Sequence, residues 1–155
     1  MSTIQHETKG EFNQIDIPDI RITKLAESLG NVLLLDEDGK TYSVGRSNKY
    51  GILGRGHECM KDAGDIQLIE GLEHEFVIDI AISTNHCLAL TCKGDVYSWG
   101  LGLDGALGYE LQNLEACQLQ PQKVEIPAFV QSIFLSAMNS GFITNEGELY
   151  ACGHN

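Results

Sequence analysis

The fold is decided by residues 88–100, which read LALTCKGDVYSWG, because the same pattern occurs twice more in the chain. The earlier copy is LLLDEDGKTYSVG at residues 33–45, and the later copy is GFITNEGELYACG at residues 141–153. Equivalent glycines are separated by 94 − 39 = 55 and 147 − 94 = 53 residues. A Gly-x-x-Tyr-x-x-Gly string that recurs in register at such a period is typical of a repeat architecture.

Each copy predicts a β-hairpin, in which a short apolar strand, a turn ending in glycine and a return strand follow one another. The turn glycine suits the left-handed backbone of a type I turn with a bulge, which is costly for a residue with a Cβ atom. Because side chains alternate along a strand, the tyrosine and its two neighbours face opposite sides, so both sides of the sheet are expected to be packed. The repeat-structural residues are Gly39, Tyr42, Gly45, Gly94, Tyr97, Trp99, Gly100, Gly147, Tyr150 and Gly153.

Further strands are expected upstream of each hairpin, where β-branched, apolar stretches occur at residues 20–25, 77–82 and 130–135. Each stretch is followed by a serine and, three residues later, by a polar side chain that we expect to hydrogen-bond a neighbouring turn. These pairs are Ser28 and Asn31, Ser83 and His86, and Ser136 and Asn139. Four short strands in about 54 residues, separated by glycines, predict a propeller blade rather than a sandwich.

The central repeat resembles that of a known family. Residues 86–100, HCLALTCKGDVYSWG, and residues 105–108, GALG, are similar to the regulator of chromosome condensation repeat, H-x-x-A-L-T-x-x-G-x-V-Y-x-W-G-x-N-x-x-G-Q-L-G. Residues 121–124, PQKV, resemble the P-x-x-V string that precedes the next repeat in that family. The resemblance covers residues 18–155. It implies an all-β fold with about three of the seven blades of a β-propeller, preceded by an N-terminal extension at residues 1–17.

The other two repeats depart from the family pattern. Asn31 and Asn139 stand where the family has histidine, and Val44 and Cys152 stand where it has tryptophan. Three blades would leave apolar surface bare at the ends of an arc, which repeat architectures normally avoid by capping or closure. We therefore expect a divergent member of the family that is completed by further blades or by other chains.

The composition indicates an ordered, acidic domain. The chain has 155 residues, 43% of them hydrophobic, and its 10 Lys and Arg against 22 Asp and Glu give a net charge of 10 − 22 = −12. Such a surface repels phosphate backbones, so neither nucleic acid nor a membrane surface is an expected partner. The five cysteines include no C-x-x-C pair and the polar start lacks a secretory signal, which predicts reduced thiols in the cytoplasm or nucleus.

Motifs for chemistry are sparse. Residues 100–105, GLGLDG, fit the G-x-G-x-x-G fingerprint of dinucleotide-binding proteins, but the repeat explains these glycines without a cofactor and no strand-helix-strand pattern surrounds them. No Ser-His-Asp order with a nucleophile elbow, phosphate-cradling loop or zinc spacing occurs. His86 would serve as a base or ligand, but asparagine in the other two repeats favours a structural role. We expect no enzyme activity, catalytic residue, cofactor or metal.

These observations favour a non-enzymatic protein-interaction module as the function. Loops between strands are the expected contact sites, and the candidate residues are Arg55, His57, Glu58, Asp104 and Tyr109. A short amphipathic turn through Leu107, Leu111 and Leu114 would pack on the adjacent blade or insert into a partner. The resemblance implies an alternative, guanine-nucleotide exchange on a Ran-like small GTPase, because such a propeller displaces nucleotide with inserted loops and needs no side-chain chemistry.

Overall fold

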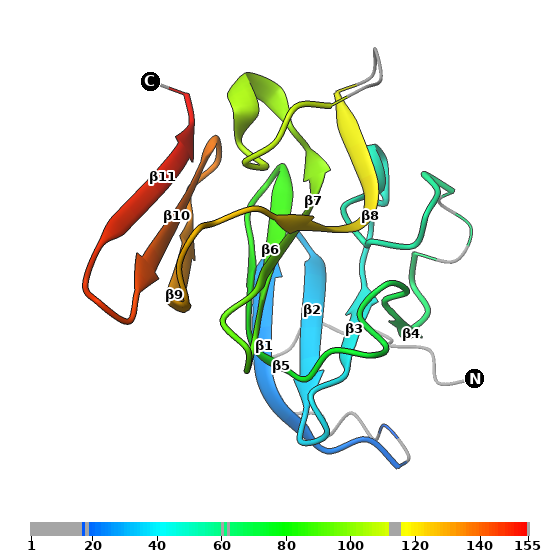
Figure 1. The fold of residues 1–155 in the computed structure, drawn as a ribbon. Coiled ribbons are helices and arrows are strands. Elements are labelled where there is room, and N and C mark those ends of the chain that lie inside the picture. The colour runs from blue at the N-terminus through cyan, green and yellow to red at the C-terminus, as the bar shows by residue number, and fades with distance from the viewer. Residues whose placement is uncertain (1–16, 18, 60, 62, 112–115, 155) are drawn as a thin grey trace, which may run out of the picture.

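The computed structural model describes residues 17, 19–59, 61, 63–111 and 116–154, which form three antiparallel sheets in chain order (Figure 1). We name these sheets blade 1, blade 2 and blade 3. Blade 1 contains β1 (Ile22–Ser28), β2 (Asn31–Asp36), β3 (Thr41–Val44) and β4 (Gln67–Leu68). Blade 2 contains β5 (Val77–Ile82), β6 (His86–Thr91), β7 (Val96–Leu101) and β8 (Cys117–Val124). Blade 3 contains β9 (Val130–Leu135), β10 (Asn139–Thr144) and β11 (Leu149–Gly153). Two 3-10 turns, η1 (Lys49–Gly51) and η2 (Leu103–Gly105), lie in the connections.

The all-β blades expected from the repeat are confirmed. The three hairpins are antiparallel pairs, β2 with β3, β6 with β7 and β10 with β11. The first strand was expected at residues 20–25 but lies at Ile22–Ser28. It extends further because its residues pair with β2 as far as the contact between Ser28 and Asn31. Of the extension predicted at residues 1–17, only Ile17 lies within the described residues.

The hairpin turns have the geometry that their glycines predict. The φ angles are 74°, 77° and 83° at Gly39, Gly94 and Gly147. Each glycine amide donates to the carbonyl three residues earlier, with N···O distances of 3.2, 3.0 and 3.0 Å. A residue with a Cβ atom is strained at such φ angles, which is the physical reason that glycine recurs at this position.

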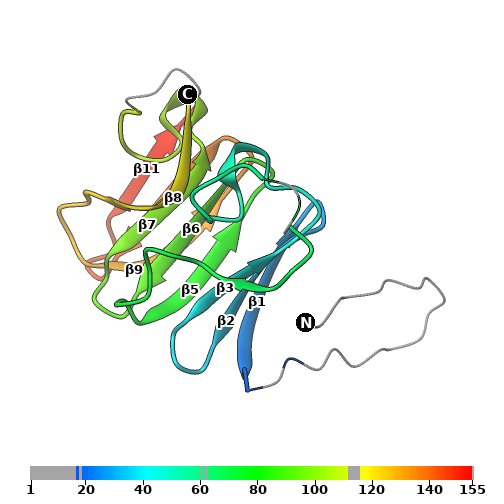
Figure 2. The ribbon, with the colours of Figure 1, turned by 90° about the vertical axis from the view of Figure 1, so that its right-hand side faces the viewer.

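The middle blade is buried on both faces because it has a neighbour on each side. One cluster lies between blades 1 and 2 and contains Leu33, Leu35, Cys87, Ala89 and Trp99. A second cluster lies between blades 2 and 3 and contains Leu88, Leu90, Val96, Val130 and Phe142. The first strands of the blades contact one another, β1 with β5 and β5 with β9, so the sheets follow one another side by side (Figure 2).

Thr41 is a buried position at which the other two repeats suggest a stabilising substitution. Its Oγ1 has no hydrogen-bond partner among the described residues, and the equivalent residues are Val96 and Leu149. We expect Thr41→Val to raise the free energy of unfolding by about 1 kcal/mol, because it removes an unsatisfied buried hydroxyl while keeping the side-chain shape. Urea denaturation measures this change.

The matched control is Thr144→Val. Thr144 is equally buried, and its Oγ1 accepts a hydrogen bond from the Glu148 amide at 3.1 Å. The control should therefore lose stability while Thr41→Val gains it. A loss of similar size in both variants would contradict the prediction.

Candidate functional site

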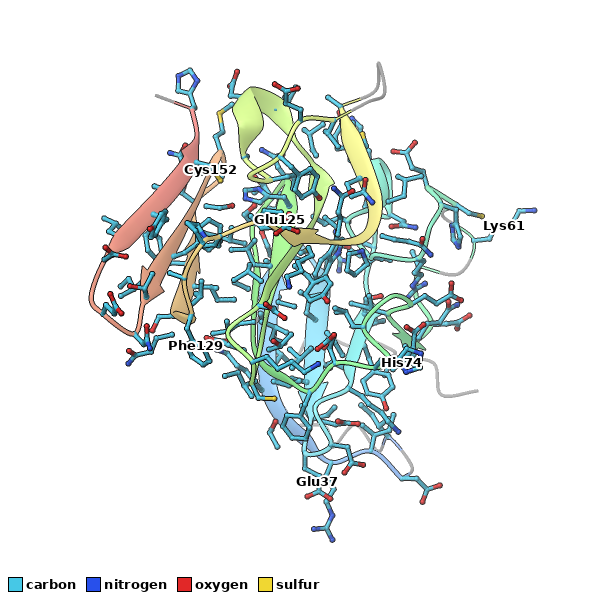
Figure 3. The ribbon with its side chains drawn as sticks, viewed as in Figure 1. Glu37, Lys61, His74, Glu125, Phe129 and Cys152 are labelled. Atoms are coloured by element: carbon cyan, nitrogen blue, oxygen red, sulfur yellow. The ribbon has the colours of Figure 1, made fainter. Side chains whose placement is uncertain are left out.

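The two ends of the blades carry different kinds of connection. The hairpin end contains the turns at residues 36–41, 91–96 and 144–149. The loop end contains the turns at residues 28–31, 83–86 and 136–139 and the described parts of the connections 45–66 and 101–116. In Figure 3, Glu37 marks the hairpin end and Cys152 lies toward the loop end. The long connections make the loop end the place for variable contact residues.

Buried hydroxyl groups tie each long connection to its own blade. Ser43 Oγ donates to the Leu53 carbonyl at 2.8 Å, and Ser98 Oγ, its repeat equivalent, donates to the Leu107 carbonyl at 2.8 Å. Both leucines are fully buried. The connections therefore leave and re-enter the blade at fixed points, which positions the residues between them.

Two of the predicted contact residues instead hold their loops in place. Arg55 is buried, contrary to the expectation of an exposed polar loop, and its guanidinium donates to the carbonyls of Ser43 and Asp65, both at 2.7 Å. Tyr109, the equivalent residue in blade 2, donates its hydroxyl to the Ser98 carbonyl at 2.9 Å, and burial raises its pKa to about 12. The exposed-loop prediction is wrong at Arg55, because the folded loop supplies acceptors that the sequence does not reveal.

One backbone carbonyl at each junction between blades accepts two side-chain hydrogen bonds. Between blades 1 and 2, the Ile52 carbonyl accepts from Trp99 Nε1 at 3.0 Å and from Cys87 Sγ at 3.4 Å. Between blades 2 and 3, the Ala106 carbonyl accepts from Ser140 Oγ at 2.7 Å and from Cys152 Sγ at 3.5 Å. Burial raises the pKa of both thiols, so they stay protonated donors rather than nucleophiles.

His86 connects to the second junction through its ring. Its Nδ1 lies 3.2 Å from Ser83 Oγ and its Nε2 lies 2.8 Å from Ser140 Oγ. Because the single hydroxyl proton of Ser140 goes to the Ala106 carbonyl, Nε2 carries the ring proton and donates it to Ser140. Burial lowers the pKa of His86 to about 4, so the ring is neutral and structural.

The role expected for the residues equivalent to His86 is confirmed at Asn31. Its Oδ1 accepts hydrogen bonds from the amides of Arg46 and Ser47, both at 3.1 Å, in the connection that follows β3. At Asn139 the same role stays a prediction. In blade 1 the polar position of the repeat therefore serves the turn that follows β3, as expected from its chemistry.

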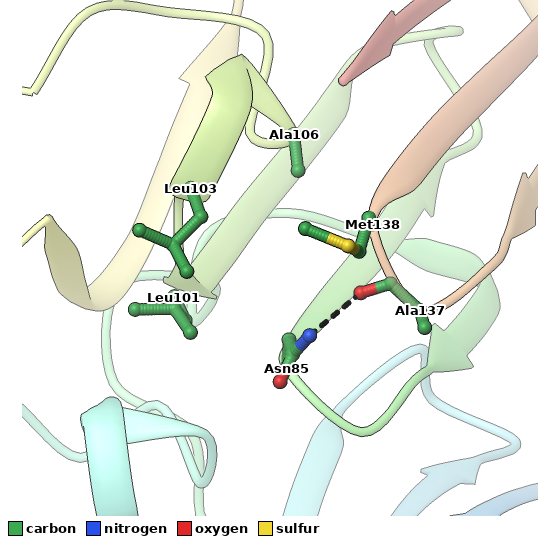
Figure 4. A pocket seen from close by; sticks show the side chains of 6 residues that line it. All are labelled: Asn85, Leu101, Leu103, Ala106, Ala137 and Met138. Atoms are coloured by element: carbon green, nitrogen blue, oxygen red, sulfur yellow. Dashed lines mark hydrogen bonds between the residues drawn. The ribbon is translucent and has the colours of Figure 1, made fainter. Parts of the chain in front are cut away.

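A small hollow opens at the loop end between blades 2 and 3 (Figure 4). It is a shallow surface depression, and its lining consists of Asn85, Leu101, Leu103, Ala106, Ala137 and Met138. Asn85 Nδ2 donates to the Ala137 carbonyl at 2.8 Å across the hollow. Leu103 at the rim is 47% exposed. The hollow thus presents Leu103, Ala137 and Met138 to solvent beside one fixed amide, whereas Leu101 and Ala106 form its buried floor.

The other predicted contact residues lie on the loop end. Asp104 and Glu58 are exposed, and His57 is half-buried. Asp104 Oδ2 lies 3.1 Å from Nδ1 of His154, and Glu58 Oε1 accepts a hydrogen bond from the Tyr50 amide at 2.6 Å. Sequence reasoning selected polar residues here and missed Leu103 and Leu29, the latter 77% exposed. Large apolar side chains next to turn glycines were the available signal.

The G-x-G-x-x-G string has the local structure of the repeat. Residues 100–105 run from the end of β7 through η2, and β7 pairs antiparallel with both β6 and β8. A Cβ atom on Gly102 would lie 2.6 Å from Cδ1 of Leu111 and 2.9 Å from Cδ1 of Leu107, so this glycine packs closely against the two leucine side chains. Leu107 and Leu111 thus pack within the blade region, whereas Leu114 lies outside the described residues.

In the described part of the chain, no three His, Cys, Asp or Glu side chains are grouped as a metal ion requires. Within the same residues, no helix has the length and apolarity of a membrane span.

Comparison with known proteins places the repeat among its relatives. The family described as "Regulator of chromosome condensation (RCC1) repeat" matches residues 38–90 and 93–143, and a second pattern with that description matches residues 77–106. The human E3 ubiquitin-protein ligase HERC2 is 28% identical over 165 residues, which cover 96% of this chain and 3% of the ligase. The guanine nucleotide exchange factor SRM1 of Saccharomyces cerevisiae is 30% identical over 140 residues, which cover 85% of this chain and 28% of the factor.

A solved structure shares both the fold and the repeat sequence. Prp20p from Saccharomyces cerevisiae, described by its binding properties to Gsp1p and histones, superposes with a TM-score of 0.76 at 29% identity. The superposition covers 89% of this chain and 32% of Prp20p. The chain therefore spans a third or less of the length of these three relatives. Since the family pattern matches more than half of the chain and the blades repeat in register, this chain belongs to the regulator of chromosome condensation (RCC1) repeat family of β-propellers.

Proposed function

We propose that this chain is a protein-interaction module whose loop end binds a partner protein. The observation that carries the proposal is the hollow between blades 2 and 3, where the exposed Leu103 and the half-buried Met138 stand beside the charged side chain of Asp104. An apolar centre with a polar rim is the usual anatomy of a protein contact surface. Leu29 adds a second exposed apolar side chain at the same end.

The side chains around the hollow support a binding role rather than a catalytic role. The hydroxyls, thiols and imidazole near the hollow make hydrogen bonds that hold blades and loops together, as for Ser140, Cys152 and His86. The relatives that share this repeat also have different activities, since one is a ubiquitin ligase and another is an exchange factor. A shared contact scaffold accounts for this variety. The compartment expected from the sequence, cytoplasm or nucleus, stays a prediction.

The test compares two exposed apolar positions of equal exposure. Leu103 at the loop end and Ile78 near the hairpin end are each 47% exposed. Cross-linking and mass spectrometry in extract should identify a partner whose capture falls about tenfold or more with Leu103→Asp, because a buried anchor would become charged. Ile78→Asp should leave that partner bound. Equal capture by wild type and both variants would contradict binding at the loop end.

Guanine-nucleotide exchange on a small GTPase is the second candidate. The observation that favours it is the 30% identity to an exchange factor, SRM1, across 85% of this chain. The experiment follows release of a fluorescent guanine nucleotide from the Ran-like small GTPase Gsp1p, with the chain present at substoichiometric concentration. Acceleration that Leu103→Asp removes would support exchange through the loop end. Binding of Gsp1p without faster nucleotide release would be consistent with the interaction module and would exclude nucleotide exchange by this chain.

A further inference from the structure

The long connection of blade 1 differs in charge from the equivalent connection of blade 2. Residues 45–66 contain four Lys and Arg and three Asp and Glu, which gives 4 − 3 = +1. Residues 101–116 contain three Asp and Glu and no Lys or Arg, which gives 0 − 3 = −3. In a chain with a net charge of −12, the blade 1 connection is therefore a local concentration of positive charge on the loop end.

The two 3-10 turns place this difference at equivalent positions. The middle residue of each turn has a left-handed backbone, with φ angles of 61° at Tyr50 in η1 and 55° at Asp104 in η2. The residue before it is Lys49 in η1 and Leu103 in η2. Blade 1 therefore has an ammonium and an aromatic ring at the positions where blade 2 has the aliphatic chain and the carboxylate of the contact surface proposed above.

Hydrogen bonds hold the blade 1 turn in this conformation. A left-handed backbone is unfavourable for a bulky residue such as tyrosine. The Tyr50 amide is fixed by Glu58, whose Oε1 accepts its hydrogen bond at 2.6 Å. The fully buried Asn48 side chain accepts from the Leu53 amide at 3.0 Å and donates to the His57 carbonyl at 2.7 Å. The turn is therefore ordered before a partner arrives, which lowers the entropic cost of binding.

The two cations of this turn region, Arg46 and Lys49, are exposed. Ion pairs with a carboxylate are made by four other cations of the chain, namely Arg21, Lys24, Lys93 and Lys123. Among the residues that the structure describes, neither Arg46 nor Lys49 is paired with a carboxylate. The Lys49 ammonium instead lies 4.6 Å from the centre of the Tyr50 ring, a contact that positions its charge. Both cations therefore remain available to an anionic partner.

An exposed leucine adjoins the cations. The Arg46 side chain lies over the turn between β1 and β2, since a Cβ atom on Gly30 would be 3.0 Å from the Arg46 Cδ. The Arg46 amide also donates to the Gly30 carbonyl at 3.2 Å. Leu29, the preceding residue of that turn, is 77% exposed. We call Leu29, Arg46, Lys49 and Tyr50 the basic loop surface; in Figure 3, Lys61 marks the same connection.

We infer that the basic loop surface binds an acidic segment of a protein partner, in which carboxylates pair with Arg46 and Lys49 and an apolar side chain contacts Leu29. The inference rests on the proposed function, because it extends the contact surface of the loop end to blade 1 and specifies the chemistry of the partner. A protein segment fits better than nucleic acid. A phosphate backbone is charged along its whole length and would also face the negative remainder of the chain, whereas a short acidic segment is confined to the basic loop surface.

The experiment uses two defined peptides as probes and the NMR amide shifts of the whole chain as the readout. A short peptide of glutamate and leucine residues should shift the amides of residues 29–31 and 46–50, and the shifts should weaken as salt is added. The matched peptide, with lysine in place of each glutamate, should leave these amides unshifted. Because the net charge of the chain repels the glutamate peptide, its binding at these residues requires a local site.

The same charge reversal at two lysines identifies the cations. Lys49→Glu should weaken binding of the glutamate peptide about fivefold or more, because an attraction becomes a repulsion. Lys40→Glu is the matched control, since Lys40 is also exposed but lies in the hairpin turn at residues 36–41, at the other end of the blade. It changes the net charge by the same amount and should leave the affinity unchanged.

Three results would overturn the inference. They are unshifted amides with the glutamate peptide, equal loss of affinity in Lys49→Glu and Lys40→Glu, and tighter binding of a single-stranded oligonucleotide of equal charge, which would assign the surface to nucleic acid. The hollow is tested separately by Leu103→Asp. If that variant loses the partner while the glutamate peptide does not bind, the proposed function stands and this inference fails. If the partner stays bound to Leu103→Asp but is lost from Lys49→Glu, the basic loop surface stands and the hollow is not the contact.

Discussion

Trp99→Ala is expected to lower the free energy of unfolding by about 3–5 kcal/mol, the range for deleting a buried large aromatic side chain. Trp99 has no exposed surface and belongs to the cluster that joins blades 1 and 2. Its indole also donates to the Ile52 carbonyl at 3.0 Å, so the substitution removes packing and leaves a carbonyl with one donor fewer. Because the free energy of unfolding of a native protein is about 5–15 kcal/mol, this single substitution removes a large part of the stability.

Urea denaturation of two further variants separates the contributions. Trp99→Phe keeps an aromatic ring but removes the indole donor and part of the buried ring volume, so its loss should lie between that of Trp99→Ala and the value of one hydrogen bond, about 1 kcal/mol. Cys152→Ala changes the equivalent residue of blade 3, which is half-buried, and should cost much less than Trp99→Ala. If Cys152→Ala and Trp99→Ala lost equal stability, the first junction would not depend on the tryptophan.

Acid is expected to destabilise the protein through His86. Burial lowers the pKa of His86 from 6.5 to about 4, so between these values the unfolded chain binds a proton that the folded chain does not. The stabilisation is therefore complete above pH 6.5 and is lost as the pH falls toward 4. Its size is on the order of 3 kcal/mol, from 1.36 kcal/mol for each pKa unit.

The measurement is the free energy of unfolding as a function of pH, compared between variants. His86→Asn introduces the residue of the other two repeats, and it should flatten the dependence between pH 4 and 6.5 even if stability at neutral pH is lower. His74→Asn is the matched control, since His74 is exposed, and it should keep the slope of the wild type. An unchanged slope in His86→Asn would assign the acid sensitivity to other groups.

The fold was predictable because the repeat fixes many positions at once. The Gly-x-x-Tyr-x-x-Gly string located the three hairpins, and β-branched stretches located β5 and β9 at residues 77–82 and 130–135. The partners of the repeat residues were not predictable, because they come from other blades. Trp99 bonds to Ile52, which is 47 residues earlier in the chain, and no local pattern indicates that contact.

The candidate site was predictable in place but not in its residues. Polar letters after Gly54 indicated an exposed loop, yet Arg55 is buried because its guanidinium finds carbonyl acceptors inside the folded connection. Tyr109, the equivalent residue in blade 2, likewise donates to a backbone carbonyl inside the fold, that of Ser98. Conversely, Leu103 is exposed although its sequence neighbours Leu101 and Leu107 are buried. Burial in these loops depends on how the connection returns to the blade, which composition does not encode.

The carbonyls of Ile52 and Ala106 have a consequence for how such repeats can diverge. The acceptor at each junction is main chain, so mutation of its own side chain leaves it in place, and only the donor side must be maintained. Indole and thiol supply the donors at one junction, and hydroxyl and thiol supply them at the other. Sequence drift can therefore replace the tryptophan that marks this repeat while the joint it served survives, so a search that relies on that residue will overlook intact blades.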